Sequence, residues 1–195
     1  AEVSGATAVG PTRATTLPGV TGYYTQDDFR TIVAAAAAHH IEVVPEIDAP
    51  AHTNAALHAL PELNSSGSFP AADPLTGTTP VNTTTSVGES SLDAANEASN
   101  TYIRHVVNQI AAMNPEGRLL HLGGDESFST TAQAYRTFMD RALTDVASTT
   151  NSSGRPLTPV VWNEAASRST LPQGTYVQVW RSHDAAAVAR LTRAV

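Results

Sequence analysis

The sequence predicts an α/β fold whose strands run parallel. Hydrophobic residues make up 41% of its 195 residues and charged residues 15%, a composition typical of a chain that buries a core. Short apolar runs alternate along the chain with longer segments in which apolar residues recur at helical spacing. Repeated alternation of strand and helix implies parallel strands joined by right-handed crossovers. The length is sufficient for one or two domains.

The first helix and the first strand are predicted from local signals. Residues 1–22 are rich in Gly, Thr, Ala and Pro and are expected to form a loop. Thr25 has the character of an N-cap and two aspartates follow it, so a helix is expected from there to about His39. Residues 41–48 then form an apolar run that is typical of a short buried strand ending in charge.

Residues 53–91 differ in composition from the segments on both sides. A short helix is expected over residues 54–60, after which Ser, Gly, Pro and Thr dominate. Such a segment can be a flexible linker between domains or a long loop that contributes to a ligand site. The loop is favoured because the segment follows the carboxyl end of a predicted strand.

The second half of the chain repeats the alternation of helix and strand. Helices are expected over residues 93–113, 131–147 and 184–194, and strands over residues 118–122, 159–162 and 175–180. Together with the segment near residue 45, four strands are recognisable, and the sequence contains no repeat of fixed period.

Composition and charge argue against several classes of function. The net charge is −7 with no basic stripe, so a nucleic-acid partner is not expected. No run of about 18 apolar residues is present, so a membrane partner is not expected either. The sequence contains no cysteine, which excludes disulfides and thiolate metal sites, and no pair of histidines has the spacing of a metal site. Neither a metal nor a cofactor is therefore predicted.

Polar and aromatic residues gather where the predicted strands end, which is where parallel sheets and barrels bind their ligands. The residues concerned are Glu46, Asp48 and His52 after the first strand, Asp125 and Glu126 after the second, Trp162, Asn163 and Glu164 after the third and Trp180 after the fourth. Each has an ordinary alternative when taken singly: solvated carboxylates, a hydrogen-bonded histidine at a helix start, or tryptophans packed in the core. The acidic pair is distinguished by the two glycines before it, which allow backbone or ligand to approach closely.

Three motifs resemble one enzyme family. They occur in the order Gly22-Tyr23-Tyr24-Thr25, Val43-Val44-Pro45-Glu46-Ile47-Asp48-Ala49-Pro50-Ala51-His52-Thr53 and His121-Leu122-Gly123-Gly124-Asp125-Glu126. Together they resemble the family 20 glycoside hydrolases, the β-N-acetylhexosaminidases, and most closely the secreted bacterial members. The chain departs from the family at Ala49 and Ala51, where Met and Gly are usual, and over residues 64–91, which match the usual loop poorly.

The resemblance implies a (β/α)8 TIM barrel, a fold that needs about 250 residues. The four predicted strands would be about strands three to six, so residues 1–195 would form a partial catalytic barrel domain. Open barrel edges favour self-association. The chain by itself is therefore expected to be inactive or nearly so, and unstable or oligomeric. The resemblance also implies a secreted protein, although the start of the sequence shows no signal peptide.

The resemblance further implies a reaction, the removal of terminal non-reducing β-linked N-acetylhexosamine from glycans containing N-acetylglucosamine or N-acetylgalactosamine. Adjacent residues at a strand end point in different directions, so their carboxylates do not easily face each other across one sugar. Substrate-assisted catalysis resolves this, because the acetamido oxygen of the substrate attacks C1. Glu126 would be the general acid, and Asp125 would hold the acetamido N–H and stabilise the oxazolinium.

The same resemblance assigns the remaining residues. His52, Trp162 and Trp180 would bind substrate, the tryptophans as flat apolar walls. Asp48 would orient the catalytic aspartate from the neighbouring strand end, and Glu46 is grouped with it as a supporting residue. Two alternatives stay open: an inactive or carbohydrate-binding fragment of such an enzyme, or an unrelated barrel hydrolase in which the acidic pair is a coincidence.

Overall fold

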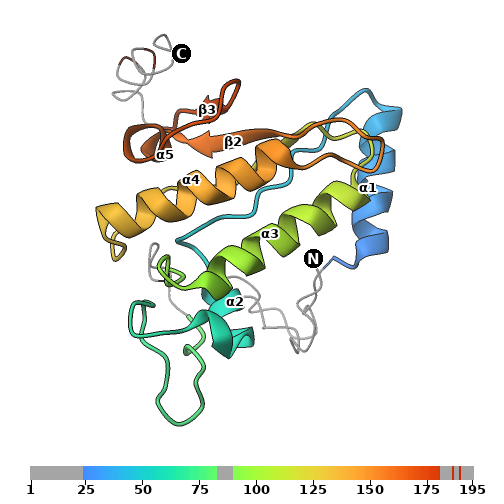
Figure 1. Ribbon diagram of the computed structural model, residues 1–195. Coiled ribbons are helices and arrows are strands. Elements are labelled where there is room, and N and C mark those ends of the chain that lie inside the picture. The colour runs from blue at the N-terminus through green and yellow to red at the C-terminus, as the bar shows by residue number, and fades with distance from the viewer. Residues whose placement is uncertain (1–23, 83–89, 181–185, 187–188, 190–195) are drawn as a thin grey trace.

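The computed structural model describes residues 24–82, 90–180, 186 and 189, and it has the predicted α/β architecture. Three parallel strands form one sheet in the order β1-β2-β3. The elements are α1 (Gln26–Ala38), α2 (Asn54–Ala59), the 3-10 helix η1 (Pro61–Leu63), α3 (Glu97–Met113), β1 (Leu119–His121), α4 (Ala132–Ser148), β2 (Thr158–Trp162), α5 (Asn163–Arg168) and β3 (Tyr176–Gln178). Figure 1 shows α3 and α4 side by side, with α2 and the loop after it at one end of the molecule.

Three helices begin at residues whose side chains cap them. Thr25 accepts a hydrogen bond from the Asp28 backbone N–H (3.1 Å), and the Asp28 carboxylate accepts one from the Thr25 N–H (2.9 Å), which completes a capping box at α1. Asn96 caps α3, and Thr131 caps α4. The predicted starts of α1 and α4 are confirmed to within one residue. The start of α3 at Glu97 is later than predicted, since a turn precedes the Asn96 cap.

Within the described range 24–82, the segment predicted as a strand at 41–48 is bridged to β1 at one position. Glu46 forms a parallel bridge with His121, and the Ile47 N–H donates to His121 O at 2.9 Å. A regular parallel ladder would next direct the Gly123 N–H to Ile47 O. The Gly123 N–H instead donates to His121 Nδ1 (2.9 Å), and the ladder ends. The prediction of a regular strand is therefore wrong, and the segment is extended chain beside β1.

The two faces of the sheet differ in character. Residues paired across a sheet point to the same side, and so do residues two apart along one strand. The pairing therefore places five side chains on one face: Glu46, His121, Val160, Trp162 and Tyr176. The opposite face is apolar and packs against α3 and α4 through Ile47, Leu120, Leu122, Val161, Val177, Ile103, Val107, Phe138 and Met139. The helices therefore cover one face, and polar and aromatic side chains stand on the other.

Several remaining expectations have mixed outcomes. The short helix predicted after residue 53 is α2, whereas α5, of the same length, was not predicted. The loop predicted over residues 1–22 lies outside the described residues. The helix predicted over 184–194 lies mostly outside them as well, and the described Ala186 and Ala189 are helical. No helix in the described part of the chain combines the length and apolarity that a membrane span needs.

Candidate active site

The Gly-Gly-Asp-Glu motif lies in an irregular segment after β1, and its two glycines are called here the Gly-Gly segment. Gly123 and Gly124 have φ values of +69° and +100°, in the left-handed region that favours glycine. A Cβ atom on Gly123 would lie 1.6 Å from Asp48 Oδ1, so only a glycine lets Asp48 approach this closely. The Gly124 N–H donates to the same oxygen (3.3 Å), and the buried Tyr135 hydroxyl of α4 donates to Gly124 O (2.5 Å). The Gly-Gly segment is thus fixed from both sides.

A Gly123→Ala substitution is expected to destabilise the chain by about 2 kcal/mol, because the methyl group adds strain at positive φ and displaces Asp48. Gly154→Ala is a matched control: φ is +76° there, and a Cβ atom would meet nothing within 4 Å. The control should lose about 1 kcal/mol or less, from backbone strain alone. Urea unfolding of both variants measures the difference, and equal losses would contradict the close approach of Asp48.

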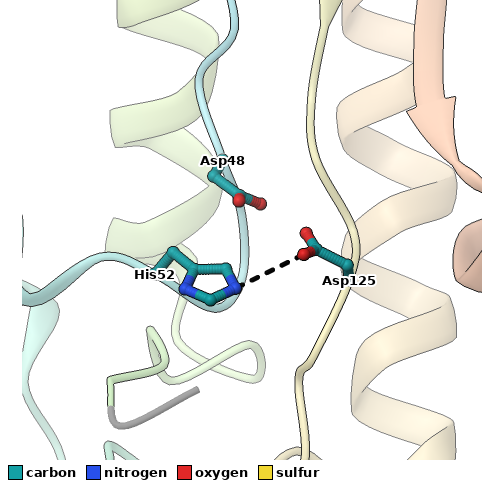
Figure 2. A group of neighbouring side chains, drawn as sticks. All are labelled: Asp48, His52 and Asp125. Carbon is teal, nitrogen blue, oxygen red and sulfur yellow. Dashed lines mark ion pairs between the residues drawn. The ribbon is translucent and has the colours of Figure 1, made fainter. Parts of the chain in front are cut away.

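His52 contacts both carboxylates of the acidic pair. Its Nε2 lies 3.4 Å from Asp125 Oδ2, an ion pair marked by the dashed line in Figure 2, and 3.3 Å from Glu126 Oε2. The exposed fractions of these side chains are 26% for His52, 15% for Asp125 and 16% for Glu126. His52 and Glu126 also have positive φ values (58° and 47°), a conformation that is costly for such residues and that recurs at functional sites. We call Asp48, His52, Asp125 and Glu126 the carboxylate–histidine cluster.

The charges within this cluster depend on one another. Hydrogen bonding to Asp125 raises the pKa of His52, and the nearby negative charges add to this effect. Burial alone would raise the pKa of Asp125, but the hydrogen bond and charge of His52 oppose burial, and the pKa of Asp125 lies below its usual range. Asp48 behaves in the opposite way, because burial and the charge of Asp125 raise its pKa to about 8. Near neutral pH, an ionised Asp125 therefore lies beside a protonated Asp48.

The cluster also contains the residue types of a metal site. Asp48, His52 and Asp125 each bring one ligand atom to within 4.8 Å of the others. In the ion-free cluster, protons on Asp48 and His52 limit the negative charge around Asp125.

An Asp125→Asn substitution is expected to lower the pKa of His52, because the hydrogen bond with Asp125 is the largest cause of its elevation. An NMR titration of the His52 ring measures this change. Asp27→Asn serves as the control, since that side chain is 92% exposed on α1 and pairs with Arg30. If the His52 pKa stays the same or rises in Asp125→Asn, the electrostatic coupling described above is wrong.

Trp162 ends β2 on the same face of the sheet as His121. Its indole N–H donates to Glu46 Oε1 at 2.9 Å, and its ring centroid lies 4.9 Å from that of His121, with the planes at 57°. Its backbone N–H donates to Gly123 O (2.9 Å), which places it beside the Gly-Gly segment. Trp162 therefore stands on the side of the candidate site and not on the helix-covered side. Glu46, expected to support the acidic pair, hydrogen bonds to Trp162.

Trp180 follows β3 and is 47% exposed. Its indole N–H lies 3.1 Å from each carboxylate oxygen of Glu164, and its backbone N–H is 3.4 Å from Asn163 Oδ1. It lies two residues beyond Gln178, which pairs with Trp162. The two tryptophans thus follow neighbouring strands, as expected, and Trp180 is tied to the start of α5.

Three further residues shape the site but were not predicted as site residues. His121 belongs to the motif and was assigned no role; its ring is buried, and burial lowers its pKa, so it stays neutral. Tyr135 has the spacing of an ordinary core residue of a helix, so no local pattern could identify it. Glu164 follows a predicted strand end, and that position was the available signal.

Comparisons with known proteins place this arrangement in a family. Residues 3–194 match the model of the glycosyl hydrolase family 20 catalytic domain. A beta-N-acetylhexosaminidase of Cellulomonas fimi is 38% identical over 162 residues, which are 83% of this chain and 29% of that protein. A beta-hexosaminidase of Vibrio furnissii is 54% identical over 41 residues, which are 21% of this chain and 7% of that protein.

Solved structures agree with this match. The GH20 beta-N-acetylhexosaminidase from Streptomyces coelicolor A3(2) has a TM-score of 0.74 and 36% identity, covering 89% of this chain and 33% of that chain. A mutant Streptomyces plicatus beta-hexosaminidase in complex with the product GlcNAc gives the same TM-score and identity, covering 89% of this chain and 32% of that chain. The chain spans about a third of the length of these relatives. The resemblance in the sequence is therefore confirmed, and the chain belongs to the catalytic domain of glycosyl hydrolase family 20.

Proposed function

We propose that this chain carries the catalytic carboxylates of a β-N-acetylhexosaminidase, which hydrolyses terminal non-reducing β-linked N-acetylhexosamine residues. The observation that carries the proposal is the position of His52 Nε2, which lies 3.4 Å from Asp125 and 3.3 Å from Glu126. One imidazole thereby reaches both members of an adjacent acidic pair. Membership of family 20 and the names of the relatives, beta-N-acetylhexosaminidase and beta-hexosaminidase, support the same reaction.

The reaction would proceed in two steps with retention of configuration. In the first, the acetamido oxygen of the substrate attacks C1, the bond from C1 to the leaving oxygen breaks, and Glu126 donates its proton to that oxygen. In the second, water attacks C1 and gives a proton to Glu126, while the bond from C1 to the acetamido oxygen breaks. The acetamido group is thereby restored, and Glu126 regains the proton for the next cycle.

Asp125 is suited to hold the acetamido N–H during both steps. Its pKa lies below the usual range, so it is ionised near neutral pH and can stabilise the positive oxazolinium. Its Oδ1 atom is buried, and apart from the carboxyl proton of Asp48 no donor of the described residues is available to it. An amide N–H of the substrate would supply a donor there. Trp162 and Trp180 would wall the sugar and its acetamido methyl group.

We further propose that the extended segment 41–48 and strands β1, β2 and β3 are about strands three to six of a (β/α)8 barrel. The parallel order and the helical cover on one face support this assignment. The face that carries Glu46, His121 and Trp162 would then line the barrel interior below the site. By this proposal, residues 1–195 form part of a catalytic barrel domain, and the remaining strands are not among the described residues.

A second candidate function is sugar binding by this chain without hydrolysis. It is favoured by the exposure of Tyr176 and Trp180, which are 60% and 47% exposed and follow one another along the uncovered face. Aromatic rings of this kind offer flat surfaces to the apolar faces of sugars. The same exposure is consistent with the expected self-association of the chain, because exposed apolar surfaces favour association.

Turnover of a chromogenic N-acetylglucosaminide distinguishes the two functions. It is to be measured for residues 1–195 and for the same residues in a polypeptide that carries a whole barrel, called here the complete barrel enzyme. Turnover by the complete barrel enzyme supports the hydrolase, whereas binding of N-acetylglucosamine without turnover by either protein supports the binding function. The matching N-acetylgalactosaminide defines which hexosamine is removed, and size-exclusion chromatography of residues 1–195 tests self-association. Secretion stays a prediction that cell fractionation would test.

A further inference from the structure

Both tryptophans of the chain donate their indole N–H to a glutamate. Trp162 donates to Glu46 Oε1 at 2.9 Å, and Trp180 lies 3.1 Å from both carboxylate oxygens of Glu164. Hydrogen bonds to a charged acceptor are stronger than neutral ones and fix the direction of the donor. An indole has a single N–H group, so each of these bonds defines the edge by which the ring is held.

The Glu46–Trp162 and Glu164–Trp180 pairs each join residues at the ends of neighbouring strands or segments of the sheet. Glu46 lies in the extended segment beside β1 and reaches Trp162 at the end of β2. Glu164 stands in the first turn of α5, directly after β2, and reaches Trp180 after β3. Each tryptophan is therefore oriented by an element other than its own strand. We propose that Glu46 and Glu164 are positioning residues that set the orientation of Trp162 and Trp180 before substrate binds.

His121 supports this role at the first pair. Its Nδ1 accepts the Gly123 N–H (2.9 Å), so the ring is neutral with its proton on Nε2. Glu46 Oε1, at 3.7 Å from the same Nδ1, is therefore not bonded to His121 and can serve the Trp162 N–H. The His121 ring packs at 4.9 Å against Trp162, so the indole is fixed at its edge by Glu46 and on its side by His121.

Indole rings held in a fixed orientation would favour substrate binding, and this inference rests on the proposed function. A sugar that binds against mobile indoles must restrict them on binding, which lowers affinity. Glutamates that hold the rings in advance remove that cost, so their loss should raise KM more than it lowers kcat. The carboxylates of Glu46 and Glu164 would contact indole N–H groups and not the reacting atoms, which distinguishes them from Asp125 and Glu126.

The two tryptophans allow each pair to be observed separately. In residues 1–195 carrying Trp180→Phe, the remaining fluorescence comes from Trp162, and in Trp162→Phe it comes from Trp180. Glu46→Ala should shift the emission of Trp162 to longer wavelength, lower its anisotropy and increase quenching by acrylamide. Glu46→Gln keeps an acceptor oxygen and should largely restore all three values. Glu164→Ala and Glu164→Gln should act on Trp180 in the same way. Glu116→Ala is the control, because Glu116 pairs with Arg155 and is 59% exposed.

In the complete barrel enzyme, Glu46→Ala should raise KM roughly three- to tenfold, the size expected for one hydrogen bond, with a smaller change in kcat. Glu46→Gln should recover most of the loss. Unchanged fluorescence of Trp162 in Glu46→Ala would overturn the proposal, and so would a changed fluorescence with an unchanged KM. Failure of the proposed function is recognised separately, because the unsubstituted complete barrel enzyme would then show no turnover.

Discussion

Replacing Glu126 by glutamine should slow hydrolysis by roughly 10²–10⁴-fold for substrates with a poor leaving group, the usual range for general acid catalysis. Such substrates need a proton on the leaving oxygen as the bond to C1 breaks, and an amide cannot provide it. Substrates with a good leaving group, such as a nitrophenolate, need little protonation and should lose much less rate in the first step. The position of Glu126 beside His52 places this carboxyl at the centre of the candidate site.

The comparison is made in the complete barrel enzyme with an N-acetylglucosamine disaccharide and a nitrophenyl N-acetylglucosaminide. Single-turnover rates isolate the first step, in which leaving-group ability matters. Glu116→Gln is the matched control, because it makes the same chemical change in an exposed ion pair with Arg155. An equal loss of rate for both substrates would show that Glu126 is not the general acid.

Several helices and strands were predicted correctly because the interactions that form them join residues close together in the sequence. Thr25 caps α1 where the N-cap pattern predicts, since the capping bond joins residues three apart. The strands around residues 120 and 160 are short apolar runs, and both belong to the parallel sheet. The prediction failed at 41–48, where His121 captures the Gly123 N–H and ends the ladder. Pro45 contributes as well, because it lacks the N–H that a parallel ladder would direct to Leu119 O.

Site residues that belong to a sequence motif were predictable. Contacts between residues far apart in the sequence were not. The acidic pair and His52 were found from motifs, and the structure brings His52 Nε2 to within 3.4 Å of both carboxylates. The bond from Trp162 to Glu46 joins residues 116 positions apart, so spacing along the chain carries no trace of it. The protonation of Asp48 cannot be predicted from the sequence either, because its pKa depends on burial and on the charge of Asp125. Contacts and charges of this kind follow from the tertiary structure.

Asp48 is expected to lower the stability of the folded chain near neutral pH while supporting the activity of the site. Its side chain accepts the Gly124 N–H and lies against the Gly-Gly segment, next to the charge of Asp125. The folded chain holds the Asp48 proton up to a pH of about 8, whereas the unfolded chain releases it near the ordinary pKa of 3.8. Between these values the folded state binds more protons than the unfolded state. The contribution of Asp48 to stability is therefore present below pH 3.8 and is lost as the pH rises toward 8.

An Asp48→Asn substitution should remove this loss, because asparagine is neutral at every pH and its oxygen can still accept the Gly124 N–H. The variant is expected to be more stable than the original chain by roughly 2–4 kcal/mol at pH 7, and by much less at pH 4. Urea unfolding at pH 4, 5.5, 7 and 8 measures the difference, with Asp27→Asn on the exposed surface of α1 as control. In the complete barrel enzyme the same variant should lose activity, since an amide, unlike the Asp48 carboxyl group, cannot release or take up a proton beside Asp125. A stability difference that is constant across this pH range would show that Asp48 is ionised in the folded chain.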